Sequence, residues 1–477
     1  MDENIPLVLD VDGTFLKTDL LFETFWSGLG HAPLATLKAT ARNFTHPAKL
    51  KAELAALGPV RMDLMPVNPD VADVAMEALR EGREVSLASA SNEALVGELA
   101  HEYGLADRVF ASSSTKNMKG AAKARALVNA YGQGGFDYAG NAPVDKAIWD
   151  QAHTALVVGD SSAARSLMKG GKLVRSFDGG WKARDVIRAL RPHQWVKNVL
   201  LFVPMLAAHD FTLASLLLVL IGIVSFSAAA SSIYIINDLL DLEADRLHVK
   251  KKNRPFASGA VPIGIGMVMS GALATFALVA AAYLGLAFFG VIVLYLILTL
   301  AYSLRLKRMR WIDIATLAAL YTIRVIAGAA AIQGEISGFL LVFIFPVFLT
   351  LGCVKRLTEL TLADHDERLP GRGYGRPDRG DLLNVAYLGM VAALLNFFLY
   401  SFTEQALRLY NTSWLLWVAM IPIAFWLRRM ILLGYAGKQD HDPVVFAMKD
   451  KRGIGLILIT IAIMFYAAGL WQQWFGL

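Results

Sequence analysis

The sequence predicts an α/β domain followed by an all-α, polytopic membrane domain, and three observations carry this prediction. Of the 477 residues, 56% are hydrophobic and only 18% are charged. The mean hydropathy of +0.47 is high for a soluble globular protein. Up to about Arg191 charges mix with short apolar runs, whereas beyond it long apolar stretches are separated by brief charged loops. We therefore expect domains at residues 1–180 and 188–477.

The first domain should contain an open α/β sheet. The opening IPLVLDVDGT is an apolar run that ends in acidic residues and a glycine turn, as expected of a buried parallel strand with a site at its carboxyl end. Similar runs follow at Val85–Ala88 and Ala155–Val158, with helical stretches between them such as Val71–Glu81. This alternation of strands and helices indicates a parallel sheet.

The second domain should contain about nine membrane spans of roughly 20 residues each, or eight if the first segment, which is short and contains Pro204, does not cross. Strongly basic loops alternate with loops that carry few basic residues, which places the basic loops and the N-terminal domain on the cytosolic face of the cytoplasmic membrane. The first residues lack the basic region of a secretory signal. The expected spans are 195–209, 213–236, 262–284, 286–304, 311–332, 338–354, 383–403, 412–432 and 453–474, and the basic loops are 238–254, 305–310, 355–379 and 438–452.

Charge and cysteine content exclude several classes of function. The net charge of +6 is assigned to the cytosolic loops of a membrane protein, so the lipid bilayer and not nucleic acid is the expected partner. Cys353 is the only cysteine, which excludes an intrachain disulfide and a thiol-based metal site. We expect Cys353 to be a packing residue.

The first candidate site is the pair of carboxylates in DVDGT. Asp10 and Asp12 are two residues apart, so their side chains share one face of the strand end. One carboxylate can attack phosphorus while the other protonates the leaving oxygen, and both can hold Mg²⁺. Taken alone, the motif also fits a strand followed by a tight turn. It resembles the first motif of the haloacid-dehalogenase-like (HAD) phosphohydrolases, and this resemblance, which covers roughly residues 5–175, implies a Rossmann-like fold.

The resemblance implies two further catalytic residues. Ser89 in SLASASN matches the second motif, whose hydroxyl binds a phosphoryl oxygen, with Ser91 and Asn92 beside it. Lys119 in NMKG matches the lysine that offsets the charge of a phosphoaspartate, and Lys123 is the substitute candidate.

The resemblance also implies a metal ligand and a cap. Asp145 in GNAPVD matches the metal carboxylate of the fourth motif. The family motif is usually GDxxxD, whereas this chain has Asn141 in place of the first acidic residue. Mg²⁺ would therefore be held by fewer charges. The segment from about Leu20 to Pro66 is helical in composition and is expected to form a small cap over the site.

The second candidate site follows an apolar segment of the membrane domain. In NDLLDLEAD, Asn237, Asp241 and Asp245 share one helical face. Such a face chelates hard cations, and Mg²⁺ held by carboxylates keeps positions open for substrate phosphates. The basic residues at 250–254 add positive charge there. An acidic helix end solvated at the membrane surface is the alternative interpretation.

A longer match supports the metal-site interpretation. The run NDLLDLEADRLHVKKKNRPFASG resembles the signature NDxxDxxxD-x-KxxRPxASG of the UbiA-type intramembrane prenyltransferases, over roughly residues 188–477. Most members carry a second motif, DxxxD, where this chain reads YSLRLKRMRWID and retains only Asp313. The basic residues there favour a donor or an acceptor with additional phosphates over an aromatic acceptor.

Four other segments point to one branch of this family, the polyprenyl-phosphate phosphoribosyltransferases. The resemblance implies that phosphoribose passes from phosphoribosyl diphosphate (PRPP) to polyprenyl phosphate, with Mg²⁺ held by Asp238, Asp241 and Asp245 and with Asn237 alongside. The fused HAD domain would then remove the 5-phosphate of the product, a precursor for cell-wall biosynthesis. The segments are Arg191–Ala208, Tyr321–Ala331, Lys355–Leu360 and Asp442–Lys451.

Basic residues around these segments are candidates for binding the phosphates. Arg324 lies inside an apolar span, where an ionisable side chain usually faces an internal cavity. The full set of candidates is Lys197, Lys252, Arg254, Arg305, Lys307, Arg324, Lys355 and Arg356.

Two other functions are compatible with the sequence. One is a UbiA-type prenyltransferase that acts on an aromatic acceptor, and the other is a non-catalytic membrane scaffold with a decayed HAD module. The intact Asp10, Asp12, Ser89 and Lys119 argue against decay. The sequence leaves open the polyprenyl chain length, the oligomeric state and whether the domains pass product directly.

Overall fold

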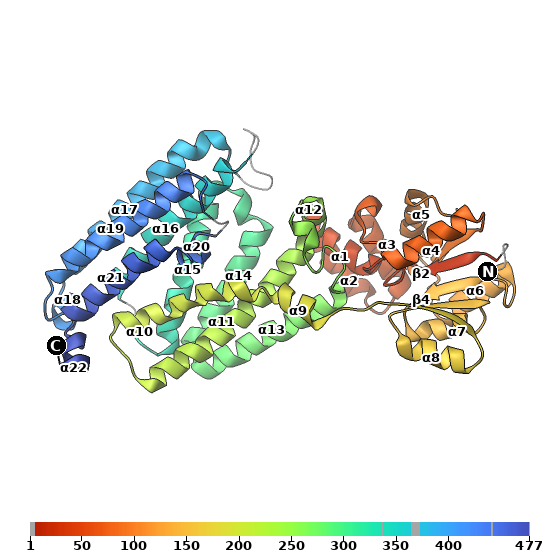
Figure 1. Ribbon diagram of the computed structural model, residues 1–477, viewed down its shortest axis with the longest axis horizontal. Coiled ribbons are helices and arrows are strands. Elements are labelled where there is room, and N and C mark those ends of the chain that lie inside the picture. Colours follow the sequence, from red (N-terminus) through yellow and green to blue (C-terminus); the bar gives the residue numbers. More distant parts are fainter. Residues whose placement is uncertain (1–4, 336, 364–372, 440–441, 477) are drawn as a thin grey trace. The chain divides into compact units, whose positions relative to one another are not determined.

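The computed structural model describes residues 5–335, 337–363, 373–439 and 442–476. The chain divides into two compact units (Figure 1). The first comprises Met1–Leu190 and Tyr234–Gly271, and the second comprises Arg191–Ile233 and Ala272–Leu477. The segment Tyr234–Gly271 carries the acidic motif, and it packs within the first unit although the sequence assigns it to the membrane domain.

The sheet of the first unit has six parallel strands in the order β3-β2-β1-β4-β5-β6. Alternate residues of β1 enter the cores on its two faces, Leu7 and Leu9 on one side and Val8 on the other. The central position of β1 brings its carboxyl end between those of β2 and β4. The predicted strands at 85–88 and 155–158 are confirmed within β2 and β5. The strands are β1 Leu7–Asp10, β2 Val85–Asn92, β3 Val109–Ser112, β4 Asp137–Gly140, β5 Thr154–Val158 and β6 Leu173–Phe177.

Three helices between β1 and β2 pack on one another: α1 (Leu20–His31), α2 (Pro33–Asn43) and α3 (Pro47–Leu57). Helix α1 begins at Leu20 because the Asp19 carboxylate accepts hydrogen bonds from the first backbone N–H groups. The remaining helices of the N-terminal segment are η1 Met62–Leu64, α4 Pro69–Arg80, α5 Glu93–Glu102, α6 Ala121–Tyr131, η2 Pro143–Asp145, α7 Lys146–Trp149, α8 Ser161–Lys169 and α9 Ala183–Leu190.

The segment Tyr234–Gly271 completes the first unit. It contains the end of α11 (Leu213–Leu240), the short helix α12 (Leu242–Leu247), the 3₁₀ turn η4 (Lys251–Asn253) and the beginning of α13 (Ile263–Leu284). The helical path is interrupted at Asp241, whose φ of −105° and ψ of 17° are not α-helical.

Seven helices of the described residues are long and apolar enough to cross a bilayer, and two of the expected spans are not single long helices. Residues 195–209 form a 3₁₀ helix, η3 (Pro192–Phe202), and the short α10 (Val203–Ala207) that contains Pro204. Residues 453–474 form α21 (Lys451–Ala467) and α22 (Leu470–Phe475), separated at Gly469, whose φ is +76°. The seven helices are α11, α13, α14 Leu286–Leu304, α15 Ile312–Ala331, α16 Gly338–Thr361, α17 Arg379–Tyr400 and α19 Leu415–Tyr435. The shorter elements of this part are η5 Leu306–Arg308, η6 Arg376–Asp378, α18 Glu404–Leu409 and α20 Pro443–Ala447.

Helix α15 forms the centre of the second unit. Most of its residues are buried, including Asp313, Tyr321 and Arg324. Cys353 of α16 is a buried free thiol in a core cluster that also contains Ile314. The expectation that Cys353 is a packing residue is confirmed.

Candidate active sites

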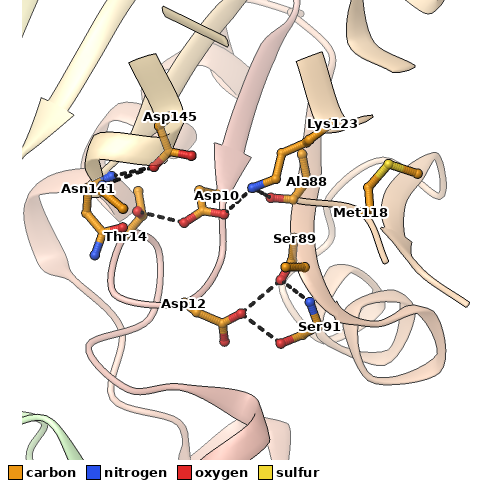
Figure 2. A network of polar contacts seen from close by, with 12 residues as sticks. Asp10, Asp12, Thr14, Ala88, Ser89, Ser91, Met118, Lys123, Asn141 and Asp145 are labelled. Atoms are coloured by element: carbon orange, nitrogen blue, oxygen red, sulfur yellow. Dashed lines mark hydrogen bonds and ion pairs between the residues drawn. The ribbon is translucent and has the colours of Figure 1, made fainter. Parts of the chain in front are cut away.

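The first site lies at the carboxyl end of β1, where Asp10 is almost completely buried. Its Oδ1 is 2.6 Å from Nζ of Lys123, and its Oδ2 accepts a hydrogen bond from the Thr14 hydroxyl at 3.1 Å (Figure 2). The Lys123 ammonium also donates to the Ala88 carbonyl and to the Tyr138 hydroxyl, at 3.1 and 3.0 Å. Three fixed contacts therefore hold a cation against one carboxylate oxygen.

Asp12, two residues beyond Asp10, is held by two hydroxyl groups. The hydroxyls of Ser89 and Ser91 donate to its Oδ2 at 2.9 and 2.7 Å (Figure 2). The backbone N–H of Leu20, the first residue of α1, donates to its Oδ1 at 2.9 Å. The structure thus brings Ser89 next to Asp12, as expected from adjacent parallel strands.

The structure corrects the lysine assignment. Lys119 is exposed and lies before α6, whereas Lys123 is buried in the first turn of α6 and contacts Asp10. Because successive residues of a helix point in different directions, only the position that faces the sheet reaches the carboxylate. Lys123, the substitute candidate, therefore takes the position that the sequence assigned to Lys119.

Asp145 and Asn141 complete the edge of the site. The Asp145 Oδ2 accepts hydrogen bonds from the N–H groups of Asn141 and Ala142 at 3.2 and 3.0 Å, and its Oδ1 accepts one from Tyr138 at 3.2 Å. The Asn141 side chain packs on the turn at Gly13, where an added Cβ would lie 2.2 Å from its Nδ2. The residue that departs from the family motif thus packs on the turn that follows Asp12.

Burial raises the pKa of Asp10 to about 6; the Lys123 ammonium lowers it, while the Asp145 and Asp12 carboxylates raise it. Asp12 and Asp145 therefore both repel the ionised Asp10, and the carboxylate oxygens suit a hard cation such as Mg²⁺. Within the described residues, no three acidic, histidine or cysteine side chains come close enough to form a complete metal site. The metal role of Asp10, Asp12 and Asp145 stays a prediction.

Sequence reasoning missed Lys51, which extends from α3 to this site. Its Nζ donates to the Ala90 carbonyl at 2.5 Å, between the two serines that bind Asp12. This contact agrees with the expected cap, because it brings the helical segment to the strand ends. A lysine in a surface helix carries no sequence signal that would distinguish it from its neighbours.

The second site lies at the acidic motif of the first unit. Asp238 and Asp245 are buried, and their carboxylates lie 3.0 and 2.6 Å from the same nitrogen, Nη1 of Arg254. The Oδ1 of Asn237 is buried, and it has no hydrogen-bond partner among the residues that the structure describes. Burial raises the pKa of Asp245, and Arg254 opposes the rise. Two carboxylates that converge on one cationic nitrogen supply oxygen ligands of the kind that suit a divalent ion completed by substrate phosphates.

The other predicted residues of this motif lie close by in sequence but differ in environment. Asp241 is half-buried at the interruption between α11 and α12, and Lys252 is exposed. Arg254 is engaged by the two aspartates, so a phosphate ligand would have to share or take over that contact.

A cluster of basic residues occupies the second unit. Lys197 forms an ion pair with Asp442, whose Oδ2 also accepts a hydrogen bond from Tyr321 at 3.2 Å. Burial raises the pKa of Asp442, but the charges of Lys197 and Lys355 outweigh it and lower the pKa to about 2. Asp442 was missed as a site residue, although an Asp-Pro pair at a helix start marks it as the N-cap of α20.

Arg324 is buried in the same unit within a cage of aromatic rings. Its Nε donates to Asn198 Oδ1 at 3.2 Å and its Nη2 to the Tyr295 hydroxyl at 3.4 Å. Its guanidinium carbon lies 5.1, 5.3 and 5.5 Å from the ring centres of Phe226, Tyr295 and Tyr321. No ion pair with a carboxylate is found for Arg324 among the described residues, so its charge is balanced by dipoles and ring faces.

Arg356 is placed differently from the other candidates. Its guanidinium contacts Asp313 through Nε and Nη2, at 2.5 and 2.9 Å, and both side chains are completely buried. Tyr302 donates to Asp313 at 2.8 Å, and Glu359 also pairs with Arg356. Asp313, the one acidic residue that remains of the second motif, thus forms an ion pair with the buried Arg356. Of the remaining candidates, Arg305 is exposed and Lys307 is half-buried, at η5.

Comparison with known proteins identifies relatives of both parts. The sequence model of the UbiA prenyltransferase family matches residues 199–371. The uncharacterized protein y4nM of Sinorhizobium fredii is 33% identical over 97% of this chain and 91% of its own length. The decaprenyl-phosphate phosphoribosyltransferase of Mycobacterium tuberculosis is 34% identical over 56% of this chain and 88% of its own length. The structure of a UbiA homolog from Archaeoglobus fulgidus bound to GPP and Mg²⁺ matches with a TM-score of 0.44 and 17% identity, over 60% of this chain and 99% of that chain.

Proposed function

The chain belongs to the UbiA prenyltransferase family and is an integral membrane transferase, and on this premise we propose that it transfers phosphoribose from PRPP to polyprenyl phosphate. We further propose that residues 1–180 form a HAD-like phosphatase domain that removes the 5-phosphate of the lipid product. The basic loops support a cytosolic location of this domain at the cytoplasmic membrane.

The convergence of Asp238 and Asp245 on one cationic nitrogen carries the transferase proposal. Bound Mg²⁺ would supply charge neutralisation for the donor diphosphate at Asp238, Asp241 and Asp245. Asn237 contributes a buried amide oxygen for which the described part of the chain offers no hydrogen-bond partner. Arg254, Lys252 and the neighbouring lysines supply positive charge for the phosphate oxygens.

The transfer step itself breaks the bond between ribose C1 and the diphosphate oxygen. The bonding electrons leave with the diphosphate, and an oxygen of the lipid phosphate forms the new bond to C1 from the opposite face. The protein positions the two anions and neutralises their charge. The aromatic cage gives Arg324 a fixed orientation, which supports a role for this residue, with Lys197 and Lys355, in binding a phosphate.

The aromatic-acceptor alternative has less support. The family resemblance implies that members with two acidic motifs bind metal with both of them. In this chain the second motif retains only Asp313, whose charge is neutralised by Arg356. Such a buried ion pair supports the interpretation that this position serves the structure of the second unit.

In the proposed phosphatase step, Asp10 attacks the phosphorus of the 5-phosphate and the bond to the ribose oxygen breaks. Asp12, oriented by Ser89 and Ser91, gives its proton to that oxygen. Lys123 holds the attacking carboxylate in place. A water oxygen then attacks the phosphorus, a proton of this water passes to Asp12, and the bond from phosphorus to Asp10 breaks to release inorganic phosphate.

A product analysis tests the proposal. Detergent-solubilised full-length protein is incubated with polyprenyl phosphate, Mg²⁺ and PRPP, and a parallel sample receives prenyl diphosphate and an aromatic acid. The proposal predicts a ribosylated lipid phosphate in the first sample and inorganic phosphate release. A prenylated aromatic acid in the second sample, with PRPP unchanged in the first, would instead establish the alternative.

A further inference from the structure

The acidic motif is attached to the phosphatase-like fold by a buried ion pair. Arg246 follows Asp245 directly, and its Nη2 and Nη1 lie 2.5 and 3.1 Å from the two carboxylate oxygens of Glu23 in α1. The two side chains are only 6% and 3% exposed. The Arg246 Nε also donates to the Ala257 carbonyl at 3.1 Å. Arg246 of α12 thus contacts both α1 and the chain after the motif. The labels of α12 and α1 lie close together in Figure 1.

Two glycines after the motif pack against the same part of the N-terminal fold. Gly259 has a φ of +69°, and a Cβ added there would lie 2.5 Å from Cβ of Lys17. A Cβ added at Gly264 would lie 3.1 Å from the Phe22 ring. Arg246, Gly259 and Gly264 each have a neighbour within residues 17–23, so this short stretch supports the motif at three points.

Residues 17–23 are themselves fixed by the phosphatase-like site. The Leu20 N–H donates to Asp12, and Asp19 caps α1. Glu23 accepts a further hydrogen bond from Thr18 at 2.5 Å. A continuous series of contacts therefore runs from Asp12 through the first turn of α1 and the Glu23–Arg246 pair to Asp245.

We propose that Glu23 and Arg246 are positioning residues for the transferase, and that the N-terminal fold holds the acidic motif in the geometry that binds the donor diphosphate. This inference rests on the proposed function and extends it, because it makes the phosphatase-like domain a structural part of the transferase site. If a neutral side chain replaces one partner, the ion pair is lost and α12 becomes free to move relative to Asp238.

The test compares Glu23→Gln with Glu53→Gln in the full-length protein. Glu53 of α3 forms an exposed ion pair with Arg42, so this variant controls for the loss of a charge in the same group of helices. Glu23→Gln is expected to raise the KM for PRPP by about 10-fold, the scale of lost outer-shell support. Its backbone amides at 241–247 should exchange hydrogen for deuterium faster, while phosphatase turnover stays at the level of the parent protein. Glu53→Gln should change neither quantity.

A second variant covers the case in which the unpaired arginine prevents folding. Glu23→Gln combined with Arg246→Met removes both charges and leaves no buried ion. It should fold, as shown by phosphatase turnover, and retain the raised KM and the faster exchange. Parent-like exchange at 241–247 in either folded variant overturns the proposal, and so does faster exchange with an unchanged KM. If the parent protein does not use PRPP, the proposed function fails, and the exchange measurement alone still decides whether the pair positions the motif.

Discussion

Lys123 Nζ lies 2.6 Å from Asp10 Oδ1, and this contact assigns the cation of the phosphatase-like site to α6. Lys119, four residues earlier, is exposed. We predict that Lys123→Met lowers phosphatase turnover by about 100-fold or more, since a fixed charge beside a developing anion contributes on this scale. Lys119→Met is the matched control and should retain most of the turnover. Equal losses in the two variants, measured with a phosphomonoester, would contradict this assignment.

The pH dependence of the proposed phosphatase activity should reflect Asp10. Burial raises the pKa of this carboxyl to about 6, against the lowering effect of Lys123. Only the ionised carboxylate attacks phosphorus, so kcat/KM should fall as the pH drops through about 6. A bound divalent cation favours the ionised form, so the acidic limb should move to lower pH as Mg²⁺ is raised. A limb near pH 4 that does not respond to Mg²⁺ would show that Asp10 is not the titrating nucleophile.

Asp241 should be essential to the transferase. We predict that Asp241→Asn lowers lipid transfer by at least about 100-fold, because even outer-shell partners of metal ligands contribute 10- to 100-fold. The exposed Glu243 on the same turn supplies the control variant, Glu243→Gln, which should keep most of the activity. Both variants should keep the phosphatase turnover of the parent. Unchanged lipid transfer in Asp241→Asn would exclude the proposed metal site.

The buried pair of Arg356 and Asp313 should contribute mainly to stability. Arg356→Met leaves a buried carboxylate without its cation, and such a loss costs about 3–5 kcal/mol. The melting temperature in detergent should therefore fall. It should recover when Asp313→Asn is added, because no buried charge then remains. Arg408→Met, which breaks a highly exposed pair with Glu404, should have little effect. A double variant as unstable as the single one would show that the charge pair is not the cause.

The strands and the acidic motifs could be predicted because each depends on a short stretch of sequence. Asp10 and Asp12 follow one apolar run, and Ser89 ends another, so the parallel sheet brings them together. The position of Lys123 depends on the orientation of α6 against the sheet, which no local pattern specifies. The pairs Lys197–Asp442 and Glu23–Arg246 join residues more than 200 positions apart, and each partner alone looks like an ordinary charged residue.

Two of the expected spans do not form one long continuous helix, because hydropathy measures composition and not continuity. Pro204 and Gly469 lie inside apolar segments of sufficient length. Around Pro204 the chain forms a 3₁₀ helix and a short α-helix, and at Gly469 a left-handed residue ends α21. Proline removes a backbone donor, and glycine permits positive φ, so both interrupt a helix without lowering the hydropathy of the segment much.

The last prediction joins the two proposed activities in one product. With PRPP and polyprenyl phosphate, the parent protein should accumulate a lipid without the ribose 5-phosphate, whereas Asp10→Asn should accumulate a lipid heavier by one phosphoryl group. The fusion raises the effective concentration of the phosphatase site near the transferase product. Asp70→Asn, which removes an exposed carboxylate of α4, is the control and should give the product of the parent.

The outcome of this experiment separates the two halves of the proposed function. Lipids of equal mass from the parent and from Asp10→Asn would mean that the phosphatase-like site acts on another substrate. The transferase assignment would survive, because it rests on the acidic motif and on the relatives of the membrane part. In a further step, purified parent protein is added to the phosphorylated lipid that Asp10→Asn has accumulated. Removal of the phosphate would show that the phosphatase-like site of the parent recognises the lipid itself. Since Asp10→Asn removes only the attacking oxygen, its own transfer rate should equal that of the parent.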